Sequence, residues 1–102
     1  MTKPTDLSIL KRDAHAMAGY LKLLANPERL LMLCQMNEQE ISVGELTEIS
    51  GLSQSAVSQH LARLREKGIV SLRAEAQTRY YSLSDPKMKR IIAALCEACH
   101  GG

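Results

Sequence analysis

Apolar residues recur every three or four positions along most of this chain, which is the spacing of helices that bury one side. The first run predicts a helix over about residues 5–25, and the last run predicts a helix over about residues 86–99. Three shorter helices are predicted between them. In chain order, the apolar positions of the five segments are Leu7, Leu10, Ala14, Met17, Leu21 and Leu24; Leu30, Leu31, Leu33 and Cys34; Val43, Leu46 and Ile49; Val57, Leu61 and Leu64; and Met88, Ile91, Ile92, Leu95 and Cys99.

Capping residues mark where these helices begin and end. Asn26-Pro27 and Asp85-Pro86 each place a capping side chain before a proline, whose missing N–H is harmless at the first helical position. Ser42-Val43-Gly44-Glu45 has the pattern of a reciprocal capping box. Gly51 and Gly68 stand where helices commonly end in a left-handed residue.

The helical spacing stops after Gly68. Residues 69–73 and 78–83 are rich in strand-forming side chains and are separated by the polar residues 74–77, which predicts a β-hairpin. This order is that of a winged helix-turn-helix: two helices, a short helix, a turn, a helix, a hairpin and a last helix. We therefore expect one mainly α-helical domain over residues 1–102, with the helix-turn-helix at about 43–67 and the wing at about 69–83.

The charges are segregated along the chain. Residues 60–90 hold eight Lys or Arg against three acidic residues, whereas residues 28–50 hold five Glu against one Arg. Such segregation is typical of a protein with one nucleic-acid-binding face. The chain has no apolar run long enough for a secretory signal or a membrane span, so we expect a cytoplasmic protein without a membrane partner.

Double-stranded DNA is the partner that the fourth helix predicts. Val57, Leu61 and Leu64 fix its core side, which leaves small hydroxyls and amides near its N-terminus for base edges and phosphates. His60 borders the core and is expected to donate one hydrogen bond to phosphate or backbone. The predicted DNA contacts in the helix and the wing are Gln54, Ser55, Ser58, Gln59, His60, Arg63, Arg73, Gln77 and Arg79.

Four stretches resemble the ArsR/SmtB family of bacterial winged-helix repressors. They are residues 29–33 (RLLML), 42–46 (SVGEL), 52–61 (LSQSAVSQHL) and the Tyr80-Tyr81 pair. The resemblance implies a homodimer held through the first and last helices, which occupies an operator and leaves it when an inducer binds. The two recognition helices would then enter half-sites roughly 34 Å apart.

The cysteines set this chain apart from the metal sensors of that family. Those sensors carry a Cys-x-Cys-type pair in the third helix, where this chain has Ser42 and Gly44. The chain is most similar to the persulfide- and redox-sensing BigR/HlyU-like branch, in which a cysteine of the second helix and one near the chain's end react together. Cys34 matches the first position, and the second falls on His100 with Cys99 adjacent and Cys96 one turn earlier.

Several other functions stay open at this point. Cys34, Cys96 and Cys99, with His100 as an additional ligand, could bind arsenite or a soft divalent metal as the inducer. A winged helix can also bind another protein instead of DNA. The pattern Cys96-x-x-Cys99-His100 matches a covalent haem attachment sequence, but that modification requires export. We expect no enzymatic activity, because no nucleophile, base and orienting group form a recognisable set.

Overall fold

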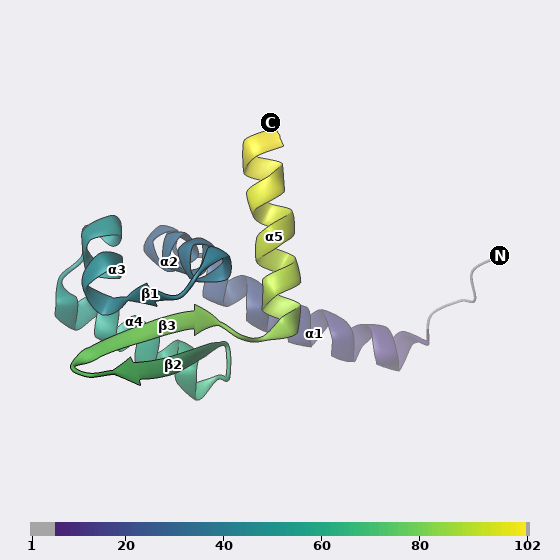
Figure 1. The fold of residues 1–102 in the computed structure, drawn as a ribbon. Helices are drawn as coiled ribbons and strands as arrows, with labels where there is room; N and C mark the ends of the chain where they lie inside the picture. The colour runs from purple at the N-terminus through teal and green to yellow at the C-terminus, as the bar shows by residue number, and fades with distance from the viewer. Residues whose placement is uncertain (1–5, 102) are drawn as a thin grey trace.

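The computed structural model describes residues 6–101 and, within α5, side chains as far as Cys99. The chain forms five helices and three strands in this part, in the order that the sequence predicts for the helices and the hairpin (Figure 1). The elements are α1 (Leu7–Leu24), α2 (Pro27–Glu38), β1 (Ile41–Ser42), α3 (Val43–Ser50), α4 (Gln54–Glu66), β2 (Val70–Glu75), β3 (Thr78–Leu83) and α5 (Pro86–Gly101). The predicted winged helix-turn-helix is confirmed.

The predicted capping residues start and end the helices. The Asn26 side chain accepts a hydrogen bond from the Arg29 backbone N–H at 2.9 Å, and Asp85 accepts one from Met88 at 2.8 Å. Ser42 and the residue three positions later form the complete capping box at the start of α3. Gly51 and Gly68 both have φ of 72°, a backbone conformation that favours glycine. Local chemistry therefore fixes the helix boundaries.

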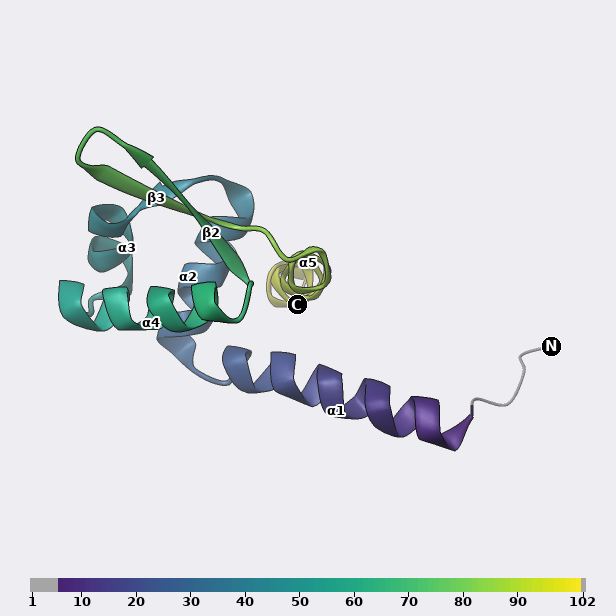
Figure 2. The ribbon, with the colours of Figure 1, turned by 90° about the horizontal axis from the view of Figure 1, so that it is seen from below.

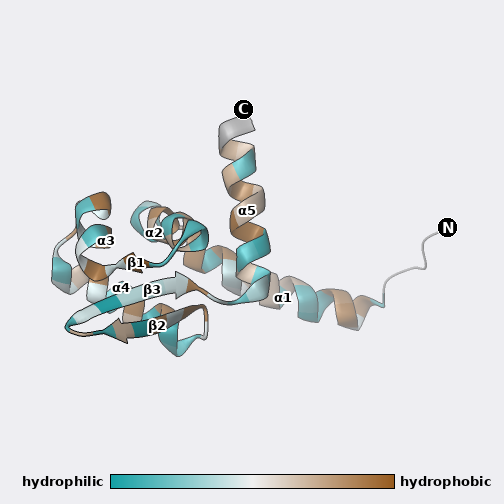
Figure 3. Ribbon diagram, in the orientation of Figure 1, coloured by the Kyte–Doolittle hydropathy of each residue, from teal (hydrophilic) through white to brown (hydrophobic). Residues whose placement is uncertain are grey.

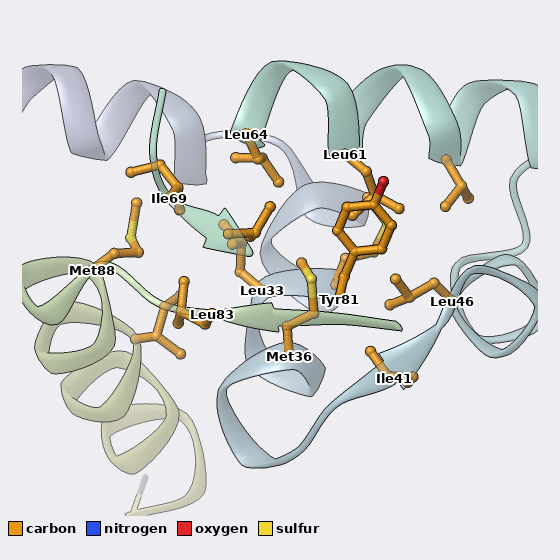
Figure 4. Packing of buried hydrophobic residues seen from close by; sticks show 14 of the residues in the cluster. Leu33, Met36, Ile41, Leu46, Leu61, Leu64, Ile69, Tyr81, Leu83 and Met88 are labelled. Atoms are coloured by element: carbon orange, nitrogen blue, oxygen red, sulfur yellow. The ribbon is translucent and has the colours of Figure 1, made fainter. Parts of the chain in front are cut away.

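The core lies between α2, α3, α4 and the sheet (Figure 4). Val57, Leu61 and Leu64 are fully buried, as their spacing predicts. The buried side chains of α2 are Met32, Leu33 and Met36, whereas Leu31, which was expected on the core side, is 38% exposed. Leu33 is buried and Leu30 and Cys34 pack against the core, as predicted, so the prediction misplaced only Leu31 and missed Met32 and Met36.

The sheet has one strand more than the sequence predicts. Its order is β1-β3-β2, with Ile41 opposite Tyr81 and all neighbours antiparallel. The hairpin is also longer than expected, because β2 continues to Glu75 and leaves only Ala76 and Gln77 in the turn. Ala76 has φ of 54°, which is the positive φ that tight hairpin turns require. The wing is thus a regular hairpin of β2 and β3, and β1 anchors it by pairing with β3.

Helix α5 extends from this body (Figure 1), and so does helix α1 (Figure 2). The radius of gyration is 15.6 Å, against roughly 13 Å for a compact domain of this length. Leu24 is the one buried residue that α1 contributes, and apolar residues recur along its exposed length (Figure 3). In α5, Met88 and Ile92 are buried. No described helix is long and apolar enough to cross a membrane.

Candidate DNA-binding surface and thiol pair

Helix α4 presents its polar side to solvent. The Ser53 hydroxyl caps the helix by accepting a hydrogen bond from the Ala56 backbone N–H at 3.1 Å, so α4 begins at Gln54. The core side is buried against the body, which fixes the side of the helix that faces solvent. Five of the predicted DNA contacts are exposed along the rest of α4, namely Gln54, Ser55, Ser58, Gln59 and Arg63.

A cleft of about 1040 Å³ separates α4 from the wing and the start of α3. It brings Gln54 and Ser58 of α4 together with Gln77 and Arg79 of the hairpin, four residues that the sequence assigned to DNA binding. The residues that line the cleft are Ser42, Val43, Gly44, Gln54, Ser58, Ala62, Arg65, Glu66, Gln77, Thr78, Arg79 and Tyr81.

The sequence reasoning missed Arg65 in this cleft. Arg65 lies seven residues after Ser58, so helical spacing alone could have placed it on the same side of α4. Arg65 and Arg79 line the cleft together with one acidic residue, Glu66. Among the described residues, neither arginine forms an ion pair. Both cations are therefore available to an anionic ligand such as a phosphate.

Arg73, the other predicted arginine of the wing, has protein partners. Its guanidinium lies 3.0 Å from the Glu40 carboxylate and 3.6 Å from that of Glu75. It also lies 4.8 Å from the centre of the Tyr80 ring. The hydrogen bond to Glu40 raises the pKa of Arg73 further above its usual value. The carboxylates of Glu40 and Glu75 thus largely balance the charge of Arg73. DNA contact by Arg73 stays a prediction.

His60 lies half-buried beside α2, as expected for a residue at the border of the core. Burial lowers the pKa of His60, and the charges of Arg29 and Arg63 lower it further. The lowered pKa favours the neutral imidazole, which is suited to donating one hydrogen bond. Arg29 also fixes the end of α1, because its Nε donates to the Leu23 carbonyl at 2.6 Å.

Two cysteines meet at the junction of α2 and α5. The Sγ atoms of Cys34 and Cys96 are 3.1 Å apart, although 62 residues separate them in the sequence. Both side chains are half-buried and pack against the core, whereas Cys99 is exposed. Burial and the Cys96 thiol raise the pKa of Cys34 to about 12, so Cys34 is protonated at neutral pH. The structure thus brings Cys96 into contact with Cys34, while Cys99 acts on Cys34 through its charge.

The soft-ion alternative gains no support from this arrangement. Among the described side chains, no group of three or more His, Cys, Asp and Glu is placed to hold a metal ion. His100, the additional ligand considered above, has a side chain outside the described part. The described thiols therefore form a pair with one exposed neighbour.

Comparisons with known proteins agree with the fold. The model of the arsR family of bacterial regulatory proteins matches residues 26–71. The transcriptional activator HlyU of Vibrio cholerae is 45% identical over 92 residues, which cover 90% of this chain and 85% of HlyU. A biofilm growth-associated repressor of Agrobacterium fabrum is 40% identical over 100 residues, which cover 93% of this chain and 86% of the repressor.

A solved structure also matches almost the whole chain. Reduced HlyU from Vibrio cholerae N16961 superposes with a TM-score of 0.82 at 45% identity, covering 87% of this chain and 94% of that chain. The chain belongs to the ArsR family of winged-helix transcriptional regulators, which are DNA-binding proteins and not enzymes.

Proposed function

We propose that this chain is a homodimeric repressor whose affinity for operator DNA falls when Cys34 and Cys96 become covalently linked. The observation that carries the proposal is the 3.1 Å contact between the two Sγ atoms. One cysteine belongs to the DNA-binding body, and the other belongs to a helix that extends away from that body (Figure 1). A bond between them would fix the angle at which the two parts meet.

The exposed side of α4 and the cleft beside it form the proposed DNA-binding surface. Small polar side chains near the start of α4, such as Ser55 and Gln59, allow the helix to approach base edges closely. Arg65 and Arg79 in the cleft would neutralise phosphates, which supplies affinity without sequence preference. Specificity would then come from α4, and most of the salt-dependent affinity from the cleft.

The exposed apolar side of α1 supports a second copy of the chain as the partner. Covering apolar side chains that a lone chain leaves in water lowers the free energy, and a symmetric copy of the chain can cover them. The exposed large apolar residues of α1 are Leu7, Ile9, Leu10, Met17 and Leu21. The α5 helix lies beside the same end of the body, so a dimer would hold both helices (Figure 2).

The thiol pair would act through the geometry of that dimer. The Sγ atoms need to approach by roughly 1 Å to form a bond of ordinary length. Because α2 is packed in the body, the strain would move α5. Since α5 would contact the second copy in the dimer, its movement would also shift the partner's recognition helix. Two recognition helices that no longer match half-sites roughly 34 Å apart would bind the operator more weakly.

A pair of serine variants tests the role of the thiols. Cys34→Ser and Cys96→Ser should both bind a DNA fragment from the chain's own promoter region as the reduced protein does. After treatment with cysteine persulfide, only the unmodified protein should lose affinity, as measured by fluorescence anisotropy. Release of the Cys34→Ser variant by the persulfide would contradict the proposal.

Parallel samples distinguish the inducer classes. We expect intact mass spectrometry and peptide mapping to find the Cys34 link to Cys96 in the persulfide-treated protein. Arsenite and zinc, added separately to reduced protein, should leave the affinity unchanged. Release by arsenite or zinc alone would replace the thiol switch with a soft-ion site at the same cysteines.

A further inference from the structure

The three cysteines differ in how easily a reagent in solution can reach them. Cys34 and Cys96 pack against the core, while Cys99 is exposed near the end of α5. Thiol chemistry with a small molecule requires collision with an accessible thiolate. Access therefore favours Cys99 over both members of the contacting pair.

Cys34 is the least suitable thiol to react first. Burial and the neighbouring Cys96 raise its pKa to about 12, which keeps almost all of it protonated at neutral pH. The negative charge of Glu38 acts in the same direction. A protonated, half-buried thiol is a poor nucleophile towards a reagent in solution.

Cys99 is well placed to pass the oxidation on to Cys96. Residues three positions apart in a helix have Cβ atoms roughly 5–6 Å apart on the same side. A disulfide needs the Cβ atoms roughly 3.5–4.5 Å apart, so the last turn of α5, which ends two residues after Cys99, must loosen as the bond forms. Cys96 in turn touches Cys34, so the three thiols form a sequence from solvent to the junction of α2 and α5.

We propose that Cys99 is the receiving thiol of the switch, which reacts first with a low-molecular-weight persulfide and passes the oxidation through Cys96 to Cys34. The proposal rests on the thiol switch proposed above and assigns the order in which its cysteines react. Cys99 is regenerated at the end, so it acts on the rate of linkage and not on its final extent.

Each step is an ordinary thiol exchange. The Cys99 thiolate attacks the terminal sulfur of the persulfide, the donor's S–S bond breaks, and the donor leaves as a thiolate. The Cys96 thiolate then attacks Sγ of Cys99, forms a Cys96–Cys99 disulfide and expels hydrosulfide.

Finally, Cys34 attacks Sγ of Cys96 and gives its proton to the departing Cys99 thiolate. In sum, two protein thiols lose two electrons to one persulfide. The products are the Cys34–Cys96 disulfide, one donor thiol and one hydrogen sulfide.

The rate of linkage in Cys99→Ser tests the order. The full-length protein and the variant are mixed with cysteine persulfide, quenched with a maleimide at set times and analysed by intact mass spectrometry. We expect the variant to form the Cys34–Cys96 link at least about tenfold more slowly, because the reagent must reach a half-buried thiol. Circular dichroism should show that both proteins are equally folded.

Two further variants test whether Cys99 acts because it faces Cys96 or only because it is an exposed thiol. Cys96→Ser should accumulate the added sulfur on Cys99, since the next thiol is missing. Combining Cys99→Ser with Ala98→Cys moves an exposed thiol by one position, where it does not face Cys96, and should not restore the rate. Rescue by the moved thiol would overturn the relay.

The outcomes distinguish failure of the Cys99 relay from failure of the Cys34–Cys96 switch on which it rests. If Cys99→Ser forms the link at the rate of the unmodified protein, the relay is wrong and the Cys34–Cys96 switch stands. If the unmodified protein never forms the link, both fail. Sulfur found first on Cys34 in the Cys96→Ser variant would also overturn the relay.

Discussion

Helices α4 and α1 have similar apolar stripes but opposite surroundings. Leu61 and Leu64 in α4 are fully buried, because α2, α3 and the sheet cover them. Leu10 and Leu21 in α1 are 50% and 51% exposed, because the helix extends past the end of the body. The body is thus complete within one chain, while α1 offers an apolar side that a second chain can cover.

The α5 helix belongs partly to the body and partly to the part that extends from it. Its first turns belong to the body through Met88 and Ile92, and its later turns extend away from it. Cys96 lies where α5 leaves the body, against Cys34 of α2. A covalent bond at that point would change the angle between α5 and the body without altering the core.

The largest expected effect comes from removing a core side chain of α4. Leu61→Ala should lower the free energy of unfolding by about 2–5 kcal/mol, because it leaves a cavity among fully buried neighbours. Urea unfolding followed by circular dichroism measures this loss, which should be the same at all protein concentrations. Gln59→Ala, on the exposed side of α4, is the control and should change stability little.

A charge on the apolar side of α1 should weaken dimer formation and leave the fold of the single chain intact. Leu21→Glu places a carboxylate on a surface that a dimer would bury, so we expect monomers in sedimentation experiments and DNA affinity reduced roughly a hundredfold. The body should remain folded. Arg12→Glu lies nine residues before Leu21, on the opposite side of α1, and should remain dimeric. A Leu21→Glu protein that is still a dimer would contradict the proposed interface.

Removing an unpaired arginine from the cleft should have a smaller effect, and only on DNA binding. Arg79→Ala should weaken binding to operator and unrelated DNA alike and reduce the salt slope by about 0.9 per lost phosphate contact. Anisotropy titrations over a range of salt concentrations measure the slope. Lys89→Ala in α5 is the charge-matched control. DNA binding without salt dependence in the unmodified protein would favour a protein partner for this winged helix.

Arg73→Ala should have the smallest effect of the series. The side chain is half-exposed and its charge is shared with Glu40 and Glu75, so its ion pairs contribute little stability. We expect a small shift of the urea midpoint and a smaller change in salt slope than for Arg79→Ala. An equal change in slope would mean that Arg73 leaves Glu40 to bind phosphate.

Local sequence signals predicted the helices and their caps, but contacts between distant residues were not predictable in the same way. The Asn26, Ser42 and Asp85 caps act over three residues, so their patterns are visible in the sequence. The two-residue strand β1 has no such pattern, because it exists only through its pairing with Tyr80 and Tyr81.

The candidate site divides in the same way. Helical spacing identified the exposed side of α4, and the same spacing could have added Arg65. It could not show that Arg73 meets Glu40, which is 33 residues away. The spacing also placed Cys99 on the core side of α5, whereas Cys99 is exposed and Cys96 meets Cys34, because the body ends before Cys99.

The operator affinity of the linked protein tests the central claim most directly. Protein carrying the Cys34–Cys96 link, verified by mass, is titrated into labelled promoter DNA beside the reduced protein in the same buffer. We predict an affinity at least about tenfold lower for the linked form, equal to ~1.4 kcal/mol, and full recovery after reduction with dithiothreitol. Equal affinities of the two forms would contradict the account, because the thiol pair would then not control DNA binding.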